Sequence, residues 1–249
     1  MSRPAPALRE RRTDPAGADR PRVVRLVLPA LLPLLLTVAC SGGPDGTAER
    51  TPEQVLAAAK QRLDDTSGVH VSVSTEELPP GVAGVLGADG VGLHPPAFEG
   101  TLHVVAQGIT ADVDVIAVDG AVYAKLPFTG RFTEVDPADY NAPDPAALMA
   151  PEGGLSSLLT AAEQVARGEQ RRDGASVLTT WTGTVPGQAV AAVIPTAATG
   201  AAFDASFAID DDQLLHSATL TGPFYPDADP VTYTLSFEKY GTTATITAP

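Results

Sequence analysis

Cys40 is the residue of this sequence whose type and position point most directly to chemistry. It is the only cysteine, so it has no partner for an intramolecular disulfide, and a lone cysteine is most often a small buried core residue. Its position argues against the core, because it follows an apolar run that ends in Ala39 and precedes the flexible stretch 41–46. We therefore predict that the Cys40 thiol receives a lipid and that the chain is cleaved after Ala39.

The residues before Cys40 have the order of a secretory signal. Seven arginines come first, an apolar run over 26–39 follows, and residues 36–40 read Leu-Thr-Val-Ala-Cys, which resembles a bacterial lipobox with Thr37 in place of the usual large aliphatic residue. Such an order defines an export segment, and the run is shorter than the roughly 20 residues that a membrane-spanning helix needs. We predict a cleaved signal peptide over 1–39, a lipidated tether over 40–50 and a folded domain over 51–249.

Other side chains that could act as nucleophiles, bases or metal ligands form no recognisable constellation. The histidines lack metal-ligand spacing to one another or to an acid; they are His70, His94, His103 and His216. Residues 153–157 do not fit a nucleophile elbow, and Asp210 to Asp212 lack the spacing of a calcium loop and fit a hairpin turn. The sequence predicts no enzyme, no metal and no cofactor.

The charge of the chain excludes one class of partner. Without residues 1–39 the chain keeps 9 of its 16 basic and 27 of its 30 acidic residues, a net charge of −18. Such a surface repels phosphate backbones, so we predict that the protein binds no nucleic acid. It also repels anionic lipid headgroups, so the attached lipid has to hold the protein at a membrane.

Apolar and polar residues alternate along most of the remaining chain, which is typical of strands with one wet face. The expected strands are 69–73, 98–106, 111–117, 122–126, 177–185, 203–209, 214–220, 231–237 and 240–248. Helical spacing favours helices within 51–66, 143–150, 154–167 and 187–194, the first beginning at Thr51 with Pro52 in its first turn. The prediction is an α+β fold, a large curved antiparallel sheet with helices on its concave face.

Small residues recur at the inward positions of the expected strands. They are Gly100, Ala106, Ala111, Ala117, Ala124, Gly183 and Ala205. If the sheet and the helices stay apart, such residues leave an apolar cavity that suits an apolar ligand. If the layers close together, the same residues belong to a filled core. Periodicity alone leaves both possibilities open.

Several short motifs, in order along the chain, are similar to those of one known family. They are PPAFEG at 95–100, VDGAVYAKLP at 118–127, DPADY at 136–140, PDPA at 143–146, GLSSLL at 154–159 and LTGPFY at 220–225. Together, after a lipobox-like leader, they resemble the mycobacterial LppX/LprA/LprF/LprG lipoprotein family. The resemblance implies a half-barrel sheet with helices on its inner face, an apolar cavity, and a cargo of acylated glycolipids or related lipids. For some members it also implies a membrane exporter as a partner.

Periodicity nominates the residues that would line such a cavity. They are Leu102, Val104, Val113, Val115 and Val122 from the sheet, and Leu155, Leu158, Leu159, Val190 and Ile194 from the helices. The leading hypothesis is a monomeric lipoprotein, anchored at the outer face of a cell membrane, that carries acylated lipids across the envelope. The alternatives are an envelope lipoprotein with a filled core that binds proteins, and an enzyme acting on envelope lipids or glycans.

Overall fold

The computed structural model describes residues 50–249 except 107 and 128. Eleven strands and five short helices follow one another along this part of the chain. In chain order they are α1 (Pro52–Asp64), β1 (Gly68–Ser74), β2 (Gly84–Leu93), β3 (Ala97–Ala106), β4 (Ile109–Val118), β5 (Ala121–Lys125), β6 (Thr133–Val135), the 3-10 helices η1 (Pro137–Tyr140) and η2 (Ala147–Met149), α2 (Ser157–Ala161), β7 (Glu163–Asp173), β8 (Ser176–Pro186), α3 (Gly187–Val193), β9 (Ala202–Asp210), β10 (Leu215–Gly222) and β11 (Val231–Glu238).

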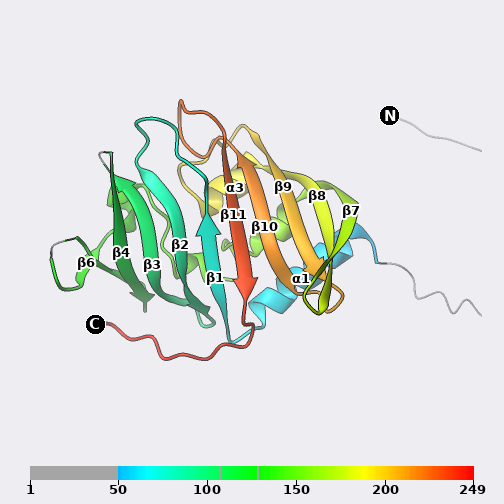
Figure 1. The fold of residues 1–249 in the computed structure, drawn as a ribbon, viewed down its shortest axis with the longest axis horizontal. Coiled ribbons are helices and arrows are strands. Elements are labelled where there is room, and N and C mark those ends of the chain that lie inside the picture. Colours follow the sequence, from blue (N-terminus) through cyan, green and yellow to red (C-terminus); the bar gives the residue numbers. More distant parts are fainter. Residues whose placement is uncertain (1–49, 107, 128) are drawn as a thin grey trace, which may run out of the picture. The chain divides into compact units, whose positions relative to one another are not determined.

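All eleven strands form one antiparallel sheet with the order β6-β5-β4-β3-β2-β1-β11-β10-β9-β8-β7. Strands β1 to β6 run outward from the centre to one edge, and β7 to β11 return from the other edge to the centre, where β11 pairs with β1. Figure 1 shows this order across the sheet, with α1 and α3 on the same face of it. The predicted fold, a large curved antiparallel sheet with a few helices on one face, is confirmed.

This topology forces one connection to cross the sheet. Because β6 and β7 lie at opposite edges, the chain between them, residues 136–162, has to pass over one face of the sheet. The crossing segment contains η1, η2 and α2. Its apolar side chains, such as Leu158 and Leu159, pack in one cluster with Phe207 of β9 and Phe237 of β11. The crossing segment is therefore the second layer of the fold over the centre of the sheet.

Helix α1 begins as the sequence predicts. The Thr51 side chain accepts a hydrogen bond from the Gln54 amide, and the Gln54 side chain accepts one from the Thr51 amide, which completes a capping box. Val55, Leu56 and Leu63 of α1 are buried at helical spacing. Each such side chain contributes roughly 1.5–3 kcal/mol when it is fully buried. The helix is held to the sheet by this apolar stripe.

Three strands of the structure were not among those expected: β2, β7 and the short edge strand β6, whose side chains are mostly exposed. Strand β2 carries glycines at Gly84, Gly87, Gly90 and Gly92, which hide its alternation. The Phe98 ring lies over Gly90, so no larger residue fits there. Strand β7 is exposed along almost its whole length and has no apolar face. The predicted helix 154–167 was therefore wrong beyond Ala161, where α2 ends and the chain continues as this edge strand.

The expected strand at 240–248 was also wrong. Strand β11 is already paired with β1 and β10, so no open edge lies beside it for a following hairpin strand. The chain instead turns at Gly241, whose amide donates to the Gly68 carbonyl at 2.9 Å. Tyr240 donates its hydroxyl proton to the Leu215 carbonyl at 2.7 Å, and Ile246 is buried against the sheet with Ala97 and Ile116. None of the helices among the described residues is long and apolar enough to cross a membrane.

Candidate functional site

A cavity of about 510 Å³ lies between the sheet and the crossing segment. Its volume is within the range of about 300–1,000 Å³ that is usual for small-molecule sites. Side chains from strands β1, β2, β3, β9, β10 and β11, from the crossing segment and from three loops line it. They are Val71, Val73, Val82, Ala83, Gly84, Val85, Ala88, Phe98, Leu102, Tyr140, Asn141, Ala142, Pro143, Pro145, Leu148, Met149, Leu155, Leu158, Leu159, Ile194, Thr196, Phe207, Leu215, Ala218, Leu220, Phe224, Tyr225, Pro226, Tyr233, Leu235 and Phe237.

The sheet side of the cavity contains a continuous row of inward side chains on six neighbouring strands. The pairing register joins Phe207, Ala218, Leu235, Val73, Ala88 and Leu102 in this order. All six line the cavity. Five spacings between adjacent strands amount to about 24 Å. That exceeds the roughly 15 Å hydrocarbon thickness of one membrane leaflet, so the wall is long enough for an acyl chain.

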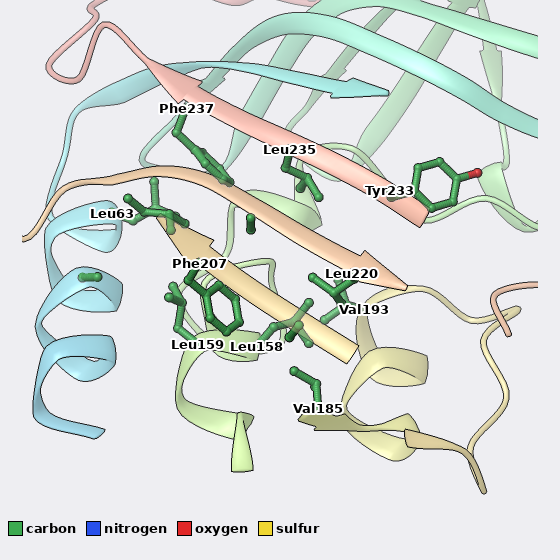
Figure 2. Close-up of a cluster of buried hydrophobic side chains, with 14 of the residues drawn as sticks. Leu63, Leu158, Leu159, Val185, Val193, Phe207, Leu220, Tyr233, Leu235 and Phe237 are labelled. Atoms are coloured by element: carbon green, nitrogen blue, oxygen red, sulfur yellow. The ribbon is translucent and has the colours of Figure 1, made fainter. Parts of the chain in front are cut away.

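The crossing segment supplies the opposite side of the cavity. Leu158 and Leu159 of α2 lie close to Phe207, while Leu235 and Phe237 point from β11 toward the same space (Figure 2). Met149 of η2 completes this side and packs over Gly92 of β2, where a β-carbon would overlap its side chain. The cavity thus lies between a rigid hydrogen-bonded sheet and a layer of short helices.

The mouth of the cavity is marked by its exposed lining residues, Ala83, Tyr140, Asn141 and Pro226. They come from the β1–β2 loop, the crossing segment and the β10–β11 loop. Tyr140 is 59% exposed, which is unusual for a large apolar side chain. An apolar ligand would enter between these loops.

The electrostatics of the cavity are simple. Among the residues that the structure describes, no acidic, basic or histidine side chain lines it, and its polar groups are those of Asn141, Thr196 and the tyrosines. Burial raises the pKa of Tyr233 far above its usual value, so that hydroxyl stays protonated. Such a wall suits an uncharged apolar ligand and would destabilise a charged one.

Comparison with known proteins identifies the family to which this chain belongs. The model of the LppX_LprAFG lipoprotein family matches residues 51–246, nearly the whole of the described region. The chain belongs to the LppX_LprAFG lipoprotein family. The prediction of this family from the motifs is confirmed.

Solved structures of this family have the same fold. LprF from Mycobacterium bovis has a TM-score of 0.65 and 16% sequence identity, covering 80% of this chain and 96% of that one. The lipoprotein LppX from Mycobacterium tuberculosis has a TM-score of 0.58 and 18% identity, covering 79% of this chain and 100% of that one. The comparison with curated protein sequences finds no match.

Five of the ten residues nominated for the cavity line it, and five do not. Those that line it are Leu102, Leu155, Leu158, Leu159 and Ile194. Val113, Val115 and Val122 belong to a second cluster, made of these three with Phe98, Ala117, Ala124 and Ala146. Val104 packs against that cluster, and Val190 of α3 is fully buried in the main core.

The physical reason is the path of the crossing segment. Strands β4 and β5 have the same inward face as β3, and Val113 is the register partner of Leu102. Over these outer strands the segment comes down onto the sheet, where Ala146 packs against them and closes the space. The cavity therefore ends at β3.

The small inward residues do not create the cavity. None of the seven from which a cavity was expected is in its wall, which consists mainly of large side chains. At Gly100 the Phe98 ring occupies the space, and at Gly183 the backbone of Glu163 lies close. The cavity results from the separation of two layers. Sequence reasoning missed the lining residues of β10, of β11, of the loops and of the first part of the crossing segment, from Tyr140 to Met149.

The histidines and Asp210 lie apart from the cavity. His94, Asp64 and Ser156 border a second, small space of about 10 Å³, behind the same side chains of Met149 and Leu155 that line the main cavity. Burial lowers the pKa of His94. Asp210 is a hairpin residue, with its carboxylate 2.8 Å from His216 Nε2. In the described part of the chain, no group of acidic, histidine and cysteine side chains could hold a metal ion. Cys40 and the predicted signal peptide lie outside the described residues.

Proposed function

We infer that this protein is a membrane-anchored carrier that holds the acyl chains of a lipid in the cavity and moves that lipid through the cell envelope. The observation that carries the inference is the apolar cavity of about 510 Å³ in the folded domain of a lipoprotein family. An apolar cavity of about 150 Å³ is already large enough to bind benzene. This one has room for much more hydrocarbon.

The alternative of a filled core that acts only through protein contacts fits the cavity less well. A filled core requires the sheet and the helical layer to close together, as they do over Val113 and Ala146. Over the six-strand row from Phe207 to Leu102 they stay apart. We therefore favour a carrier over a purely protein-binding role.

Anchoring and cargo have separate places in this proposal. The lipid on Cys40 holds the chain at the outer face of the membrane, since two or three acyl chains anchor a protein firmly. The stretch 41–50 links that anchor to the domain. The cargo is an acylated lipid whose polar part, such as a glycan, stays at the mouth near Tyr140 and Pro226. A membrane exporter or acceptor takes up the cargo when the mouth opens.

The test is mass spectrometry of organic extracts from the Cys40→Ala chain purified from its native host. Removal of the acylation site ensures that any lipid found is cargo and not anchor. We expect a defined acyl lipid at about one molecule per protein. Lipid-free protein, found again after gentle purification, would instead support the filled-core alternative.

A matched pair of variants ties any bound lipid to the cavity. Ala88 is the fifth of the six residues in the sheet row, and Asp89 beside it is exposed on the opposite face. In Ala88→Trp an indole occupies cavity volume, so the amount of co-purified lipid should fall severalfold. Asp89→Trp adds the same side chain outside and should leave the lipid content unchanged. Equal lipid loading in both variants would place the cargo elsewhere on the protein.

A further inference from the structure

One polar group of the cavity wall has a defined hydrogen-bonding role. The hydroxyls of Tyr225 and Tyr233 lie 2.7 Å apart, and the Tyr233 hydroxyl lies 2.6 Å from the Val85 carbonyl oxygen. All three residues line the cavity. The Tyr233 ring is held edge-on to Phe224, with 5.0 Å between ring centroids, and the Tyr233 residue is only 8% exposed. The Tyr233 side chain is therefore held in place, and so are the two hydrogen bonds that its hydroxyl makes.

Counting protons gives the direction of each hydrogen bond between these groups. A carbonyl oxygen only accepts, so the single Tyr233 proton is donated to Val85. Tyr233 must then accept from Tyr225, which uses the single proton of the Tyr225 hydroxyl. The Tyr225 oxygen keeps lone-pair capacity but has no proton left to donate. Toward a ligand it is an acceptor only.

The Tyr225 hydroxyl lies near the mouth. Tyr225 directly precedes the exposed Pro226, and the Tyr225 hydroxyl lies against Gly84, which directly follows the exposed Ala83. A β-carbon at Gly84 would overlap the Tyr225 hydroxyl oxygen. Deeper lining residues such as Phe207 and Phe237 are fully apolar. The acceptor therefore lies where the polar part of an inserted lipid would join its acyl chain.

We propose that the Tyr225 hydroxyl is a hydrogen-bond acceptor subsite that selects lipids carrying a hydroxyl or amide donor next to the acyl chain over lipids that present only ester carbonyls. This rests on the proposed function, since it concerns cargo in the same cavity. A donor satisfies the Tyr225 lone pair. A lipid with only acceptors faces an oxygen that cannot donate to it, and that oxygen then has no hydrogen-bond donor from the ligand.

The test compares two lipids that share one acyl chain, 1-monooleoylglycerol with free hydroxyls and methyl oleate without any. Dissociation constants are measured by displacement of a fluorescent fatty acid from the Cys40→Ala chain. The two lipids differ in hydration, so the readout is the ratio of their affinities and its change on mutation. In Tyr225→Phe the preference for monooleoylglycerol should fall about two- to tenfold, as expected for one net hydrogen bond, through weaker binding of monooleoylglycerol. The affinity for methyl oleate should not fall.

A second tyrosine is the matched control. Tyr240 is a partly buried residue whose hydroxyl donates to the Leu215 carbonyl and which does not line the cavity. Tyr240→Phe also removes one hydrogen-bonded hydroxyl, yet it should keep the wild-type ratio. Gly84→Ala, which pushes the Tyr225 hydroxyl aside, should lower the ratio in the same direction as Tyr225→Phe.

The outcomes separate this inference from the proposed function. If neither lipid displaces the probe and the probe itself does not bind, the carrier function fails. If both lipids bind and the ratio is the same in wild type and in Tyr225→Phe, the carrier stands and the acceptor subsite is refuted. A ratio that falls equally in Tyr240→Phe would also refute it, since the effect would then not come from the cavity.

Discussion

The dependence of affinity on acyl-chain length is the prediction that the cavity makes most directly. The perturbation is in the ligand: 1-decanoyl-, 1-lauroyl-, 1-myristoyl-, 1-palmitoyl- and 1-stearoylglycerol share one headgroup and differ by two methylenes per step. Each methylene buried in an apolar site contributes about 0.8 kcal/mol. One step is therefore worth up to about 1.6 kcal/mol, or roughly 15-fold in Kd. Ordering of the chain in the cavity lowers this factor.

The length of the wall sets where the increase should stop. The row from Phe207 to Leu102 spans about 24 Å across six strands. Affinity should rise steeply while added methylenes still find this wall, and level off once the chain is longer than the space. Competition with a fluorescent fatty acid, below the concentrations at which the lipids aggregate, measures the series. In Ala88→Trp the plateau should come at a shorter chain, because the indole occupies space beside β2 and shortens the row that the chain can contact.

The result that would refute this reasoning is a flat series. If Kd changes less than about twofold per step, the acyl chain lies at the surface and gains no burial. A steep series that is unchanged in Ala88→Trp would mean that the chain is buried in another place. Either result would remove the physical basis for the carrier function.

Three further outcomes test the fold around the cavity. Leu178 is fully buried and lies outside the cavity wall. The substitution Leu178→Ala should lower the free energy of unfolding by about 2–5 kcal/mol, as measured by urea denaturation. Thr51→Ala removes the capping box of α1 and should lower the free energy of unfolding by about 1 kcal/mol. Thr51→Ser keeps a hydroxyl cap and should retain most of the wild-type stability. Burial lowers the pKa of His94 below 6.5, so the unfolded state takes up the proton first and stability declines as pH falls below about 6.5. The urea midpoint of His94→Gln should decline less than that of wild type between about pH 7 and 5, and identical declines would contradict this assignment.

Much of the sheet could be predicted from the sequence because most of its strands are buried on one face only. Val71 and Val73 of β1 alternate with the polar residues His70, Ser72 and Ser74, which is a local signal. The strands that escaped prediction lack that signal. Strand β7 is exposed to solvent on both faces. Strand β2 is rich in glycine because Phe98 and Met149 pack directly over its inner surface. Their identity as strands depends on neighbours that are distant in sequence.

The extent of the cavity could not be predicted for a related reason. Leu102 and Val113 are register partners on one inward face, and nothing in their own strands distinguishes them. The difference is made by Ala146, more than thirty residues later in the chain, which packs over the β4 side and leaves the β3 side open. Periodicity identifies an inward face, but the docking of a second layer decides which part of that face stays uncovered.

The way the crossing segment is held suits a layer that has to open and close. Several of its amide groups between Asp139 and Leu159 donate to carbonyls within the segment, as Leu155 does to Leu148. Its attachment to the sheet is through side chains such as Leu158, and Lys60 of α1 holds it by a hydrogen bond to the Pro151 carbonyl at 2.6 Å. Each strand of the wall, in contrast, is bonded through its backbone to two neighbours. The free energy of local opening is lowest where few hydrogen bonds and contacts are lost. The sheet can thus remain intact while the crossing segment moves, and apolar contacts with an acyl chain can replace the leucine contacts that such a movement breaks.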